Sequence, residues 1–253
     1  MSDTRPLFEI RDLSKRYERQ PVLDHLSFDI TRGECFVILG RSGSGKTVTL
    51  RQLNALERPD GGSVRFDGTE ISSLDEADLV PFRRRIAMLF QSSALFDSMT
   101  VFDNVAFPLR EHRTLTPEAT AERVHERLRR VGLDEFAGRM PAELSGGMRK
   151  RTALARALAL EPEAVLYDEP TGGLDPMGAA SIARLIRETH DALGVTSVVV
   201  THDLVLARRV ADRVALLDAG RFRFLGTWSA AETASDPLLQ SFLAGREEQA
   251  NAA

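Results

Sequence analysis

One short stretch of the chain combines glycines, a lysine and a hydroxyl residue in a spacing suited to binding phosphate groups. It follows an apolar run, opens a helical pattern that continues with Val48, and reads Gly40-Arg41-Ser42-Gly43-Ser44-Gly45-Lys46-Thr47. Glycines let successive backbone N–H groups face a phosphate, and the helix start adds partial positive charge. In this pattern the lysine reaches the β- and γ-phosphates and the Thr47 hydroxyl ligates Mg²⁺. The stretch therefore predicts that the chain binds ATP together with Mg²⁺.

Two carboxylates follow another apolar run, Ala164 to Tyr167, and could serve the same nucleotide. Ligands collect at the carboxyl ends of strands in open α/β sheets, so a strand here would bring both acids to that edge. Asp168 is suited to hold Mg²⁺, directly or through water, and Glu169 can polarise an attacking water as a general base. Two acids at a strand end are also common as ordinary loop residues. The phosphate loop favours the catalytic interpretation.

A second helix start rich in small residues lies between these two stretches. Leu144-Ser145-Gly146-Gly147-Met148 precedes a helical pattern from Arg149 to Leu160 and could place backbone N–H groups and a serine hydroxyl on an anion. Taken alone, it could equally be a serine cap with a flexible turn. One chain does not need two phosphate-facing helix starts for one nucleotide, unless the second serves a neighbouring molecule.

A parallel sheet would bring these residues together, and apolar runs are candidates for its strands. Four runs are almost wholly apolar, as in strands buried on both faces: Cys35 to Leu39, Ala164 to Tyr167, Ser197 to Val200 and Val214 to Leu217. Helical patterns begin at about Lys46, at Pro176 and after Asp203. Strands that alternate with helices predict a mainly parallel α/β core.

The first third of the chain predicts a smaller set of strands beside that core. Leu7 to Leu13, Leu26 to Ile30 and Ser63 to Phe66 alternate in part between apolar and polar residues and are separated by turn residues. We therefore expect an α/β fold of the P-loop NTPase type, with a mainly parallel core sheet, an antiparallel β flank and an inserted helical subdomain.

The rest of the chain divides by its character. The middle, from about Thr100 to Pro141, is charged and helical in pattern. We expect one ATPase domain over residues 1–226, a helical subdomain inserted at about 92–160, and a C-terminal extension over residues 227–253. The extension contains a short apolar segment, Pro237 to Leu243, which needs cover and is expected to pack on a partner subunit. Deletion of the residues after Gly226 should then weaken pairing.

The composition narrows the possible classes of protein. With 253 residues, a net charge of −4 and 43% hydrophobic residues, the chain is typical of globular proteins and gives no reason to expect a nucleic-acid partner. The N-terminal residues do not resemble a secretory signal, and no run approaches the roughly 18 apolar residues of a membrane-spanning helix. We therefore expect a soluble protein that meets a membrane through partners. The single cysteine, Cys35, excludes an internal disulfide and fits a reducing compartment.

Lysine is rare in this sequence. The chain has thirty arginines and only three lysines, which are Lys15, Lys46 and Lys150. Where arginine is used almost everywhere, a retained lysine suggests a position that needs a compact ammonium.

The segment Leu144-Ser145-Gly146-Gly147 resembles the signature of ABC ATPases. Other motif residues of that family occur along the chain in the expected order, namely Tyr17 and Gln91 before the signature, and Gly173-Leu174-Asp175 and His202 after it. Each mark alone is weak, because Tyr17 could be a surface tyrosine and both Gln91 and His202 could cap strand ends. Their joint order, from about Leu7 to Gly226, identifies the chain as a member of this family.

The resemblance implies a role for each of these residues. Tyr17 would stack on adenine, and Gln91 would contact the metal and the attacking water. Asp175 would lie on a loop that crosses between two subunits, and His202 would touch the γ-phosphate. Two copies of the chain would face each other, each ATP lying between the phosphate loop of one copy and Ser145, Gly146 and Gly147 of the other. Hydrolysis would then drive a membrane permease.

The sequence departs from the usual family pattern at two positions. Met148 stands where most signatures have glutamine, and Gly172 stands where alanine or serine is usual before Gly-Leu-Asp. The first change leaves the phosphate-facing groups in place, and the second adds backbone freedom.

A longer segment indicates a subtype. Residues 91–111 read QSSALFDSMTVFDNVAFPLRE and are similar to the ATPases of Mla/Mce-type lipid transporters, with which Met148 and the stretch from Tyr167 to Thr171 also agree. The resemblance implies phospholipid transport, a separate permease, an Mce-domain substrate-binding protein and a small STAS-type accessory subunit. It also implies a peripheral place on the cytoplasmic side of the inner membrane. Alternatively, the apolar residues of this segment belong to a subdomain core shared by many cassettes.

Other functions remain open at this stage. The chain could energise an importer or exporter of amino acids, ions or drugs, which only the identity of the permease would decide. A soluble ABC ATPase of DNA repair would need long coiled-coil insertions, for which the stretch from Thr47 to Leu144 is too short. Relatives that act in translation carry two cassettes in one chain, and this chain has one. A regulator that binds ATP without hydrolysis is disfavoured by Glu169 and His202.

Overall fold

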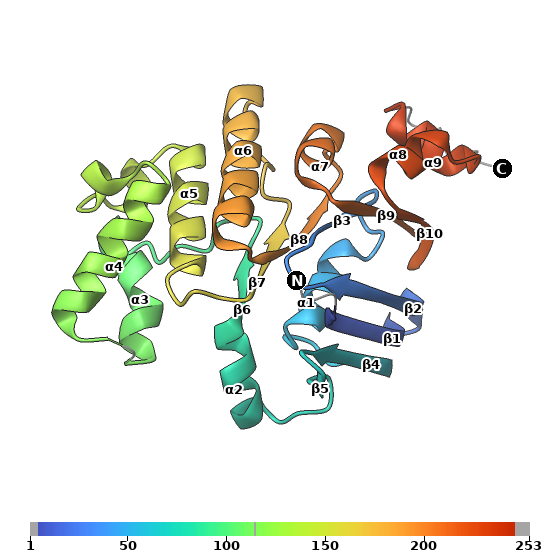
Figure 1. Cartoon of the computed structure of the whole chain (residues 1–253), viewed down its shortest axis with the longest axis horizontal. Coiled ribbons are helices and arrows are strands. Elements are labelled where there is room, and N and C mark those ends of the chain that lie inside the picture. Colours follow the sequence, from blue (N-terminus) through green and yellow to red (C-terminus); the bar gives the residue numbers. More distant parts are fainter. Residues whose placement is uncertain (1–4, 114, 246–253) are drawn as a thin grey trace.

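The computed structural model describes residues 5–113 and 115–245 and has a six-stranded, mainly parallel sheet at its centre (Figure 1). From one edge, the order is β10 (Arg221–Gly226), β9 (Arg213–Asp218), β3 (Cys35–Leu39), β8 (Thr196–Thr201), β7 (Ala164–Asp168) and β6 (Ile86–Leu89). All neighbouring pairs are parallel except β10 with β9. The predicted parallel core is confirmed.

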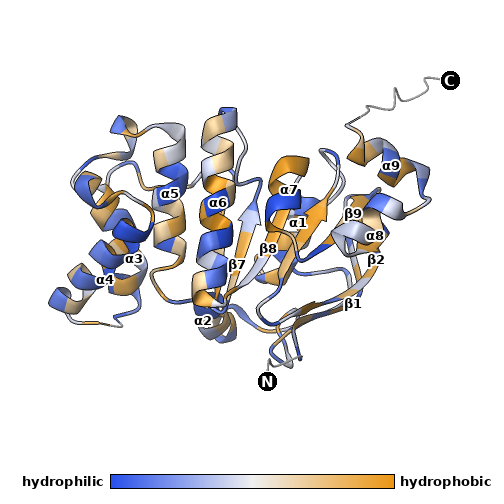
Figure 2. Ribbon diagram, turned by 45° about the horizontal axis from the view of Figure 1, so that its top comes forward, coloured by the Kyte–Doolittle hydropathy of each residue, from blue (hydrophilic) through white to orange (hydrophobic). Residues whose placement is uncertain are grey.

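The central strands are buried on both faces because each face meets its own hydrophobic cluster. In β3, Phe36 and Ile38 belong to one cluster, whereas Cys35, Val37 and Leu39 belong to the other. Successive side chains of a strand point to opposite faces, so an apolar run without polar interruptions is what this position requires. In Figure 2, orange marks hydrophobic residues along β8 and along part of β7.

A four-stranded antiparallel sheet covers one side of the core. Its order is β2 (Gln20–Thr31), β1 (Pro6–Tyr17), β4 (Gly61–Phe66) and β5 (Thr69–Glu70). Its apolar residues pack with helix α1 (Lys46–Leu53) and one face of the parallel sheet in a single cluster. The antiparallel flank is therefore confirmed, and α1 begins at the predicted residue.

Helices α3 (Val101–Glu111), α4 (Pro117–Arg130) and α5 (Gly146–Ala157) form a separate group at the end of the molecule beside β6 (Figure 1). They share an apolar cluster of their own, drawn from residues 101–159. Two short 3₁₀ turns, Asp134–Phe136 and Pro141–Glu143, connect α4 to α5. Helix α5 links this group to the rest of the protein, because its residues Ala153 and Leu154, and Leu158 just after it, pack in the cluster on the parallel sheet.

The other face of the parallel sheet is covered by α6 (Pro176–Leu193) and α7 (Leu204–Val210), which begin where the sequence predicts them. The last helices of the described residues are α8 (Trp228–Thr233) and α9 (Pro237–Leu243). None of the helices within residues 5–113 and 115–245 is both long and apolar enough to cross a membrane.

Helix α9 corrects an expectation from the sequence. Leu239 is 1% exposed within the chain's own core, and Leu238, Phe242 and Leu243 pack partly buried against the same cluster. The side-chain amide of Gln240 donates hydrogen bonds to Ala231 O and Ala234 O. The argument that this segment needs a partner subunit for cover is therefore wrong, because the same chain covers it. The predicted extension beyond Gly245 lies outside the described residues.

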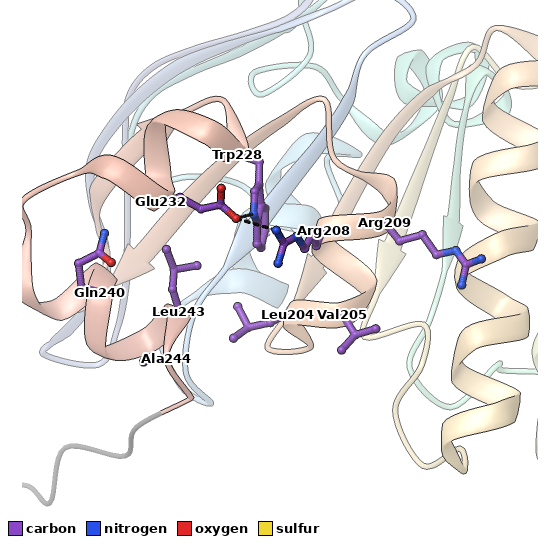
Figure 3. A pocket seen from close by; sticks show the side chains of 9 residues that line it. All are labelled: Leu204, Val205, Arg208, Arg209, Trp228, Glu232, Gln240, Leu243 and Ala244. Atoms are coloured by element: carbon purple, nitrogen blue, oxygen red, sulfur yellow. Dashed lines mark hydrogen bonds and ion pairs between the residues drawn. The ribbon is translucent and has the colours of Figure 1, made fainter.

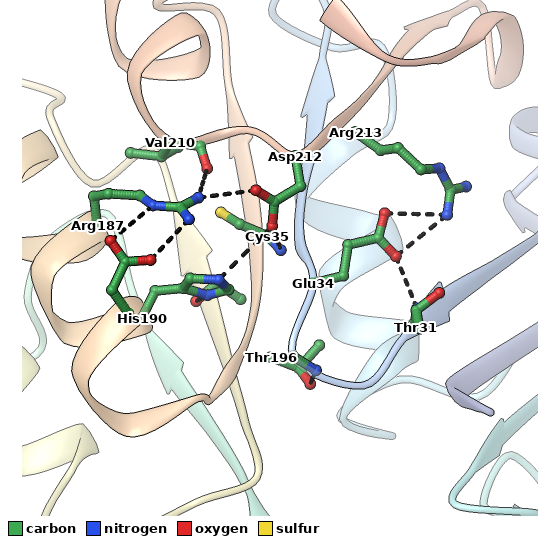
Figure 4. Close-up of polar contacts among 12 residues, drawn as sticks. Thr31, Glu34, Cys35, Arg187, His190, Thr196, Val210, Asp212 and Arg213 are labelled. Carbon is green, nitrogen blue, oxygen red and sulfur yellow. Dashed lines mark hydrogen bonds and ion pairs between the residues drawn. The ribbon is translucent and has the colours of Figure 1, made fainter. Parts of the chain in front are cut away.

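A polar cluster closes the sheet at the amino ends of β3, β8 and β9 (Figure 4). Asp212 accepts a hydrogen bond from the backbone N–H of Cys35 at 2.8 Å and one from Arg187 at 2.9 Å. Buried His190 lies 3.7 Å from the same carboxylate, and burial lowers its pKa. Burial raises the pKa of the Cys35 thiol, so this cysteine stays protonated and inert. This end of the sheet is structural, and the opposite end is free for a ligand.

Among the elements that sequence analysis did not predict, α2 and β10 were missed for identifiable reasons. Helix α2 (Glu76–Arg85) contains Pro81 and buries only Leu79, so it lacks both an uninterrupted helical pattern and an apolar face. Strand β10 is an edge strand, in which Phe222 and Phe224 pack inward between exposed arginines.

Replacement of Leu239 by alanine tests the cover that α9 gives to the core. Removing this buried side chain should lower the free energy of unfolding by about 2–5 kcal/mol, the usual cost of a large-to-small change in a core. Urea unfolding of the full chain measures it. Leu225→Ala is the control, because Leu225 is 40% exposed and its loss should stay within about 0.5 kcal/mol. Equal small losses would show that α9 does not belong to the cooperative core.

Candidate functional site

A cavity of about 1010 Å³ lies at the carboxyl ends of the parallel strands. It is lined by the phosphate loop, by residues after β6, β7 and β8, and by the C-terminal helix: Val22, Arg41, Ser42, Gly43, Gly45, Lys46, Thr47, Val48, Gln91, Glu169, His202, Leu204, Phe242 and Gly245. Most of the candidate residues predicted for one chain's share of the site thus come together in one cavity.

The phosphate loop leaves the start of α1 with free backbone donors. Gly45 occupies the N-cap position with φ of 104° and contributes no side chain to the cap. The first N–H groups of a helix have no acceptor within the helix, so they remain available to an anion. A Cβ atom at Gly45 would lie 2.8 Å from both Val22 O and Leu23 Cδ2. This position therefore requires glycine for its conformation and for the close approach of β2.

Lys46 holds a buried positive charge at the floor of the cavity. Its ammonium donates hydrogen bonds to Gly40 O at 2.7 Å and Arg41 O at 3.0 Å, and Glu169 Oε1 lies 3.5 Å away. Burial lowers the pKa of this lysine, and the Glu169 carboxylate counteracts that effect. An incoming anion would therefore replace weak carbonyl acceptors with a full negative charge.

Thr47 and Asp168 place two oxygen ligands side by side. The Thr47 hydroxyl donates a hydrogen bond of 2.9 Å to Asp168 Oδ1. Burial raises the pKa of Asp168, and the neighbouring Glu169 raises it further. Within the described residues, no group of three or more histidine, cysteine or acidic side chains is placed to hold a metal alone. The pair suits Mg²⁺, which usually takes one or two protein oxygens and completes its shell with phosphate and water.

Glu169 is turned into the cavity by its backbone. Its φ is +43°, a left-handed conformation that is uncommon for a residue with a side chain. The carboxylate accepts a 3.0 Å hydrogen bond from the Thr201 hydroxyl and lies 3.1 Å from His202 Nδ1. The Glu169 carboxylate thus lies between Lys46 and His202. This is the position that a general base needs if it is to reach a water molecule beside a bound phosphate. Thr201 is a functional contact that sequence analysis missed.

Gln91 and the two departures from the family pattern can now be placed. Gln91 is exposed and lines the cavity after β6. A Cβ at Gly172 would lie 3.2 Å from Glu169 O and 3.7 Å from Gln91 Nε2, so glycine leaves room between these two residues. Met148 is partly buried against the helical cluster, which explains an apolar side chain where a polar one is usual.

Several predicted residues lie away from the cavity. Ser145 caps α5 by accepting a hydrogen bond from Met148 N, and Asp175 caps α6 in the same way through Gly178 N. Neither they nor Gly146 and Gly147 line the cavity. These residues would therefore contact only a nucleotide that is bound in the cavity of another molecule.

Tyr17 is also outside the cavity. It lies at the end of β1, 42% exposed, with its hydroxyl hydrogen-bonded to Glu57. Burial of the hydroxyl and this hydrogen bond raise the pKa of Tyr17 to about 12. A phenyl ring that does line the cavity is that of Phe242, on α9. Sequence analysis assigned α9 no part in this site.

A second cavity, of about 640 Å³, lies between α7, α8 and α9 (Figure 3). Its polar centre is Glu232, which accepts a hydrogen bond from Trp228 Nε1 at 2.9 Å and pairs with Arg208 at 3.0 Å. Leu204 lines both cavities. Helix α9 lines both cavities, through Phe242 in the first and through Gln240 and Leu243 in the second.

Lys150 is a further polar residue that the sequence marked only by its rarity. It is 5% exposed and its ammonium donates hydrogen bonds to Gln91 O and, at 3.4 Å, to Glu169 O. It joins the two loops that carry the cavity's polar side chains.

The fold and the cavity together define an ATPase of the phosphate-loop α/β class. Residues 23–172 match the sequence profile of the ABC transporter family. The chain belongs to this family and is an ATP-binding and ATP-hydrolysing cassette of it.

Individual relatives agree with this assignment. The intermembrane phospholipid transport system ATP-binding protein MlaF of Escherichia coli K12 is 42% identical, over 94% of this chain and 89% of MlaF. The methionine import ATP-binding protein MetN of Rhizobium etli is also 42% identical, over 94% of this chain and 66% of MetN. Among solved structures, the ATP-binding cassette MJ0796, a dimer bound to ADP and Pi, superposes with a TM-score of 0.81 at 32% identity. That match covers 87% of this chain and 98% of MJ0796.

Replacement of Gly45 by alanine tests the phosphate cradle. The added Cβ would collide with β2 and strain the positive φ, so the loop should open and ATP affinity should fall at least about ten-fold, equivalent to about 1.4 kcal/mol. Titration of the purified chain with a fluorescent ATP analogue measures it. Gly68→Ala is the matched control, because Gly68 has φ of 78° and nothing within 4 Å of an added Cβ. Equal affinities in the two variants would contradict this role of the loop.

Proposed function

We propose that the chain energises a transporter of phospholipids or related lipids between membranes. The observation that carries this proposal is the similarity to MlaF, which extends over 89% of that protein at 42% identity. The segment after Gln91, at residues 91–111, also resembles ATPases of that type. Val101 and Val105 belong to the core of the helical group, whereas Phe96 is 40% exposed. The segment therefore has a core part, as the alternative interpretation expects, and an exposed part available to a permease.

The residues predicted for the nucleotide site have distinct roles in ATP hydrolysis under this proposal. The backbone of residues 40–48 and the Lys46 ammonium bind the phosphates, and Glu169 polarises the attacking water. His202 and Gln91 position the γ-phosphate and that water. Mg²⁺ would be held by Thr47, Asp168 and Gln91 and would neutralise charge on the phosphates. Positioning and charge neutralisation carry most of the catalysis in phosphoryl transfer.

The working unit would be a head-to-tail pair. Ser145, Gly146 and Gly147 carry a helix start suited to an anion, yet they lie outside the cavity of their own chain. A second copy would bring these residues to the phosphates, with Asp175 at the crossing. The dimeric cassette MJ0796 supports this arrangement by similarity. Tyr17, at the end of the hairpin that β1 forms with β2, would stack on the adenine.

The remaining partners follow from the same resemblance. The chain would lie on the cytoplasmic side of the inner membrane, bound to a permease subunit. An Mce-domain protein and a small STAS-type subunit would complete the complex. Nucleic acid has no part in it.

A second candidate function is import of a small molecule such as methionine. MetN matches this chain at the same identity as MlaF. The nucleotide site would be the same for a lipid and for a small-molecule transporter. The transported molecule must therefore be identified with the assembled transporter.

The cargo is tested by purifying the tagged chain with its permease and extracting the bound lipids for mass spectrometry. We expect co-purified phospholipid and an ATPase rate that rises when the complex is placed in phospholipid vesicles. The same complex should move labelled phospholipid between vesicles with ATP and not with ADP. Stimulation by methionine or another small solute, with no lipid transfer, would refute the lipid assignment and leave the ATPase intact.

Replacement of Glu169 by glutamine tests the catalytic base. Turnover should fall by about 10²–10⁴-fold, the usual contribution of a positioned base, while ATP binding remains. Steady-state hydrolysis by the purified transporter and nucleotide titration measure the two effects. Glu163→Gln is the control, because Glu163 pairs with Arg32 and Arg85 outside the cavity. Near-normal turnover in Glu169→Gln would remove Glu169 from this role.

A further inference from the structure

Helix α5 holds the two loops of the catalytic cavity through a buried ammonium. Lys150 lies in its second turn, and the ammonium bonds to Gln91 O and Glu169 O. These carbonyl groups follow β6 and β7, the strands at one edge of the parallel sheet. One side chain thus fixes the backbone of both Gln91 and Glu169.

The burial of this charge shows that the contact is specific. Lys150 is 5% exposed, and burial lowers its pKa, while the carboxylates of Asp168 and Glu169 act against that effect. A buried charge is tolerated only when polar partners replace water. Here the partners are two backbone carbonyls and the field of two catalytic carboxylates. An arginine is the usual cation in this chain, so the lysine fits a space for a compact group.

A second cation on the same helix holds the loop after Gln91. Arg156 donates hydrogen bonds to Ala94 O at 2.8 Å and to Ser93 O at 3.1 Å. Ser93 and Ala94 have φ of 66° and 45°, which are strained values for residues with side chains. The loop keeps this conformation because α5 binds it at both ends.

We propose that Lys150 is a positioning residue for ATP hydrolysis: it fixes the Glu169 carboxylate and the Gln91 loop relative to the phosphate loop. The inference rests on the proposed function. The backbone of Glu169 is in a left-handed conformation, and its carbonyl oxygen accepts a hydrogen bond from the Lys150 ammonium. The direction of the Glu169 carboxylate therefore depends on this contact. Loss of the ammonium removes this donor from the backbone carbonyls of Gln91 and Glu169 and lets the base shift. Because Ser145 caps the same helix, a movement of α5 is passed to Glu169.

The first test replaces Lys150 by methionine, which keeps the length of the side chain and removes the ammonium. Turnover of the purified transporter should fall about 10- to 100-fold, since a displacement of about 1 Å can cost 10²-fold. Affinity for ATP should stay within about two-fold, because Lys150 does not line the cavity. Lys150→Arg keeps the charge but replaces the compact ammonium with a larger guanidinium, so turnover should fall less than in Lys150→Met and be restored only in part. Lys150→Gln repeats the test if the methionine variant does not fold.

The matched control is Arg151→Met. Arg151 is the next residue of α5 and donates a 2.7 Å hydrogen bond to Ser181 Oγ, away from the cavity. Its loss should leave turnover unchanged, and thermal unfolding of each variant reports damage to the helix itself. Equal losses of turnover in Lys150→Met and Arg151→Met would overturn the proposal, because they would reflect general damage to α5.

A double-mutant cycle separates positioning from structure. In single-turnover assays, Lys150→Met should have no further effect beyond about two-fold in a Glu169→Gln background, because residues in one network do not act additively. An equal fall in both backgrounds would overturn the proposal, as would unchanged turnover in Lys150→Met alone. Near-normal turnover of Glu169→Gln itself would instead contradict the proposed function. The two failures are therefore distinct.

Discussion

A buried positive charge at the carboxyl edge of the parallel sheet is the interaction on which the site depends. The Lys46 ammonium lies at the floor of the cavity, where it contacts two loop carbonyls and lies 3.5 Å from Glu169, with the charge of Asp168 nearby. Its pKa is lowered by burial, and the free N–H groups of α1 add to the positive potential. A polyphosphate is the ligand that satisfies all of these groups at once. The strands of the parallel sheet bring these groups to one edge. The phosphate loop follows β3, the two carboxylates lie at the end of β7, and His202 follows β8.

The same edge explains how chemistry in the cavity is tied to distant parts of the chain. Helix α5 begins at Ser145, packs in the helical group and reaches back to Gln91 and Glu169 through Lys150. The loop held by Lys150 and Arg156 continues into the segment proposed to face a permease. One helix therefore connects three parts of the proposed mechanism: the helix start that would serve a second copy, Glu169 as the proposed base, and the segment proposed to face a permease. Direct contacts between packed residues are therefore enough to couple a movement of α5 to the cavity.

Much of the fold could be predicted from the sequence, because a short, wholly apolar run fits few structures other than a strand buried on both faces. Runs such as Cys35–Leu39 fit a strand with a core on each face, and motif spacing predicted which residues line the cavity after β3, β7 and β8. Helix α9 could not be assigned to its own core, because a short apolar segment does not say which surface covers it. Lys150 was visible only as a rare residue type, since its partners are backbone carbonyls, which leave no trace in side-chain patterns. Met148 became interpretable only once its packing was known.

The most direct measurement is sedimentation of the Glu169→Gln chain with ATP, where bound nucleotide is not consumed. A site shared between two copies predicts a monomer with ADP and a dimer with ATP, and loss of that dimer when Gly147→Gln is added. Within one chain, a Cβ at Gly147 meets nothing within 4 Å, so the substitution fits the fold and disturbs only a surface. A chain that stays monomeric with saturating ATP, or a dimer indifferent to Gly147→Gln, would contradict the shared site.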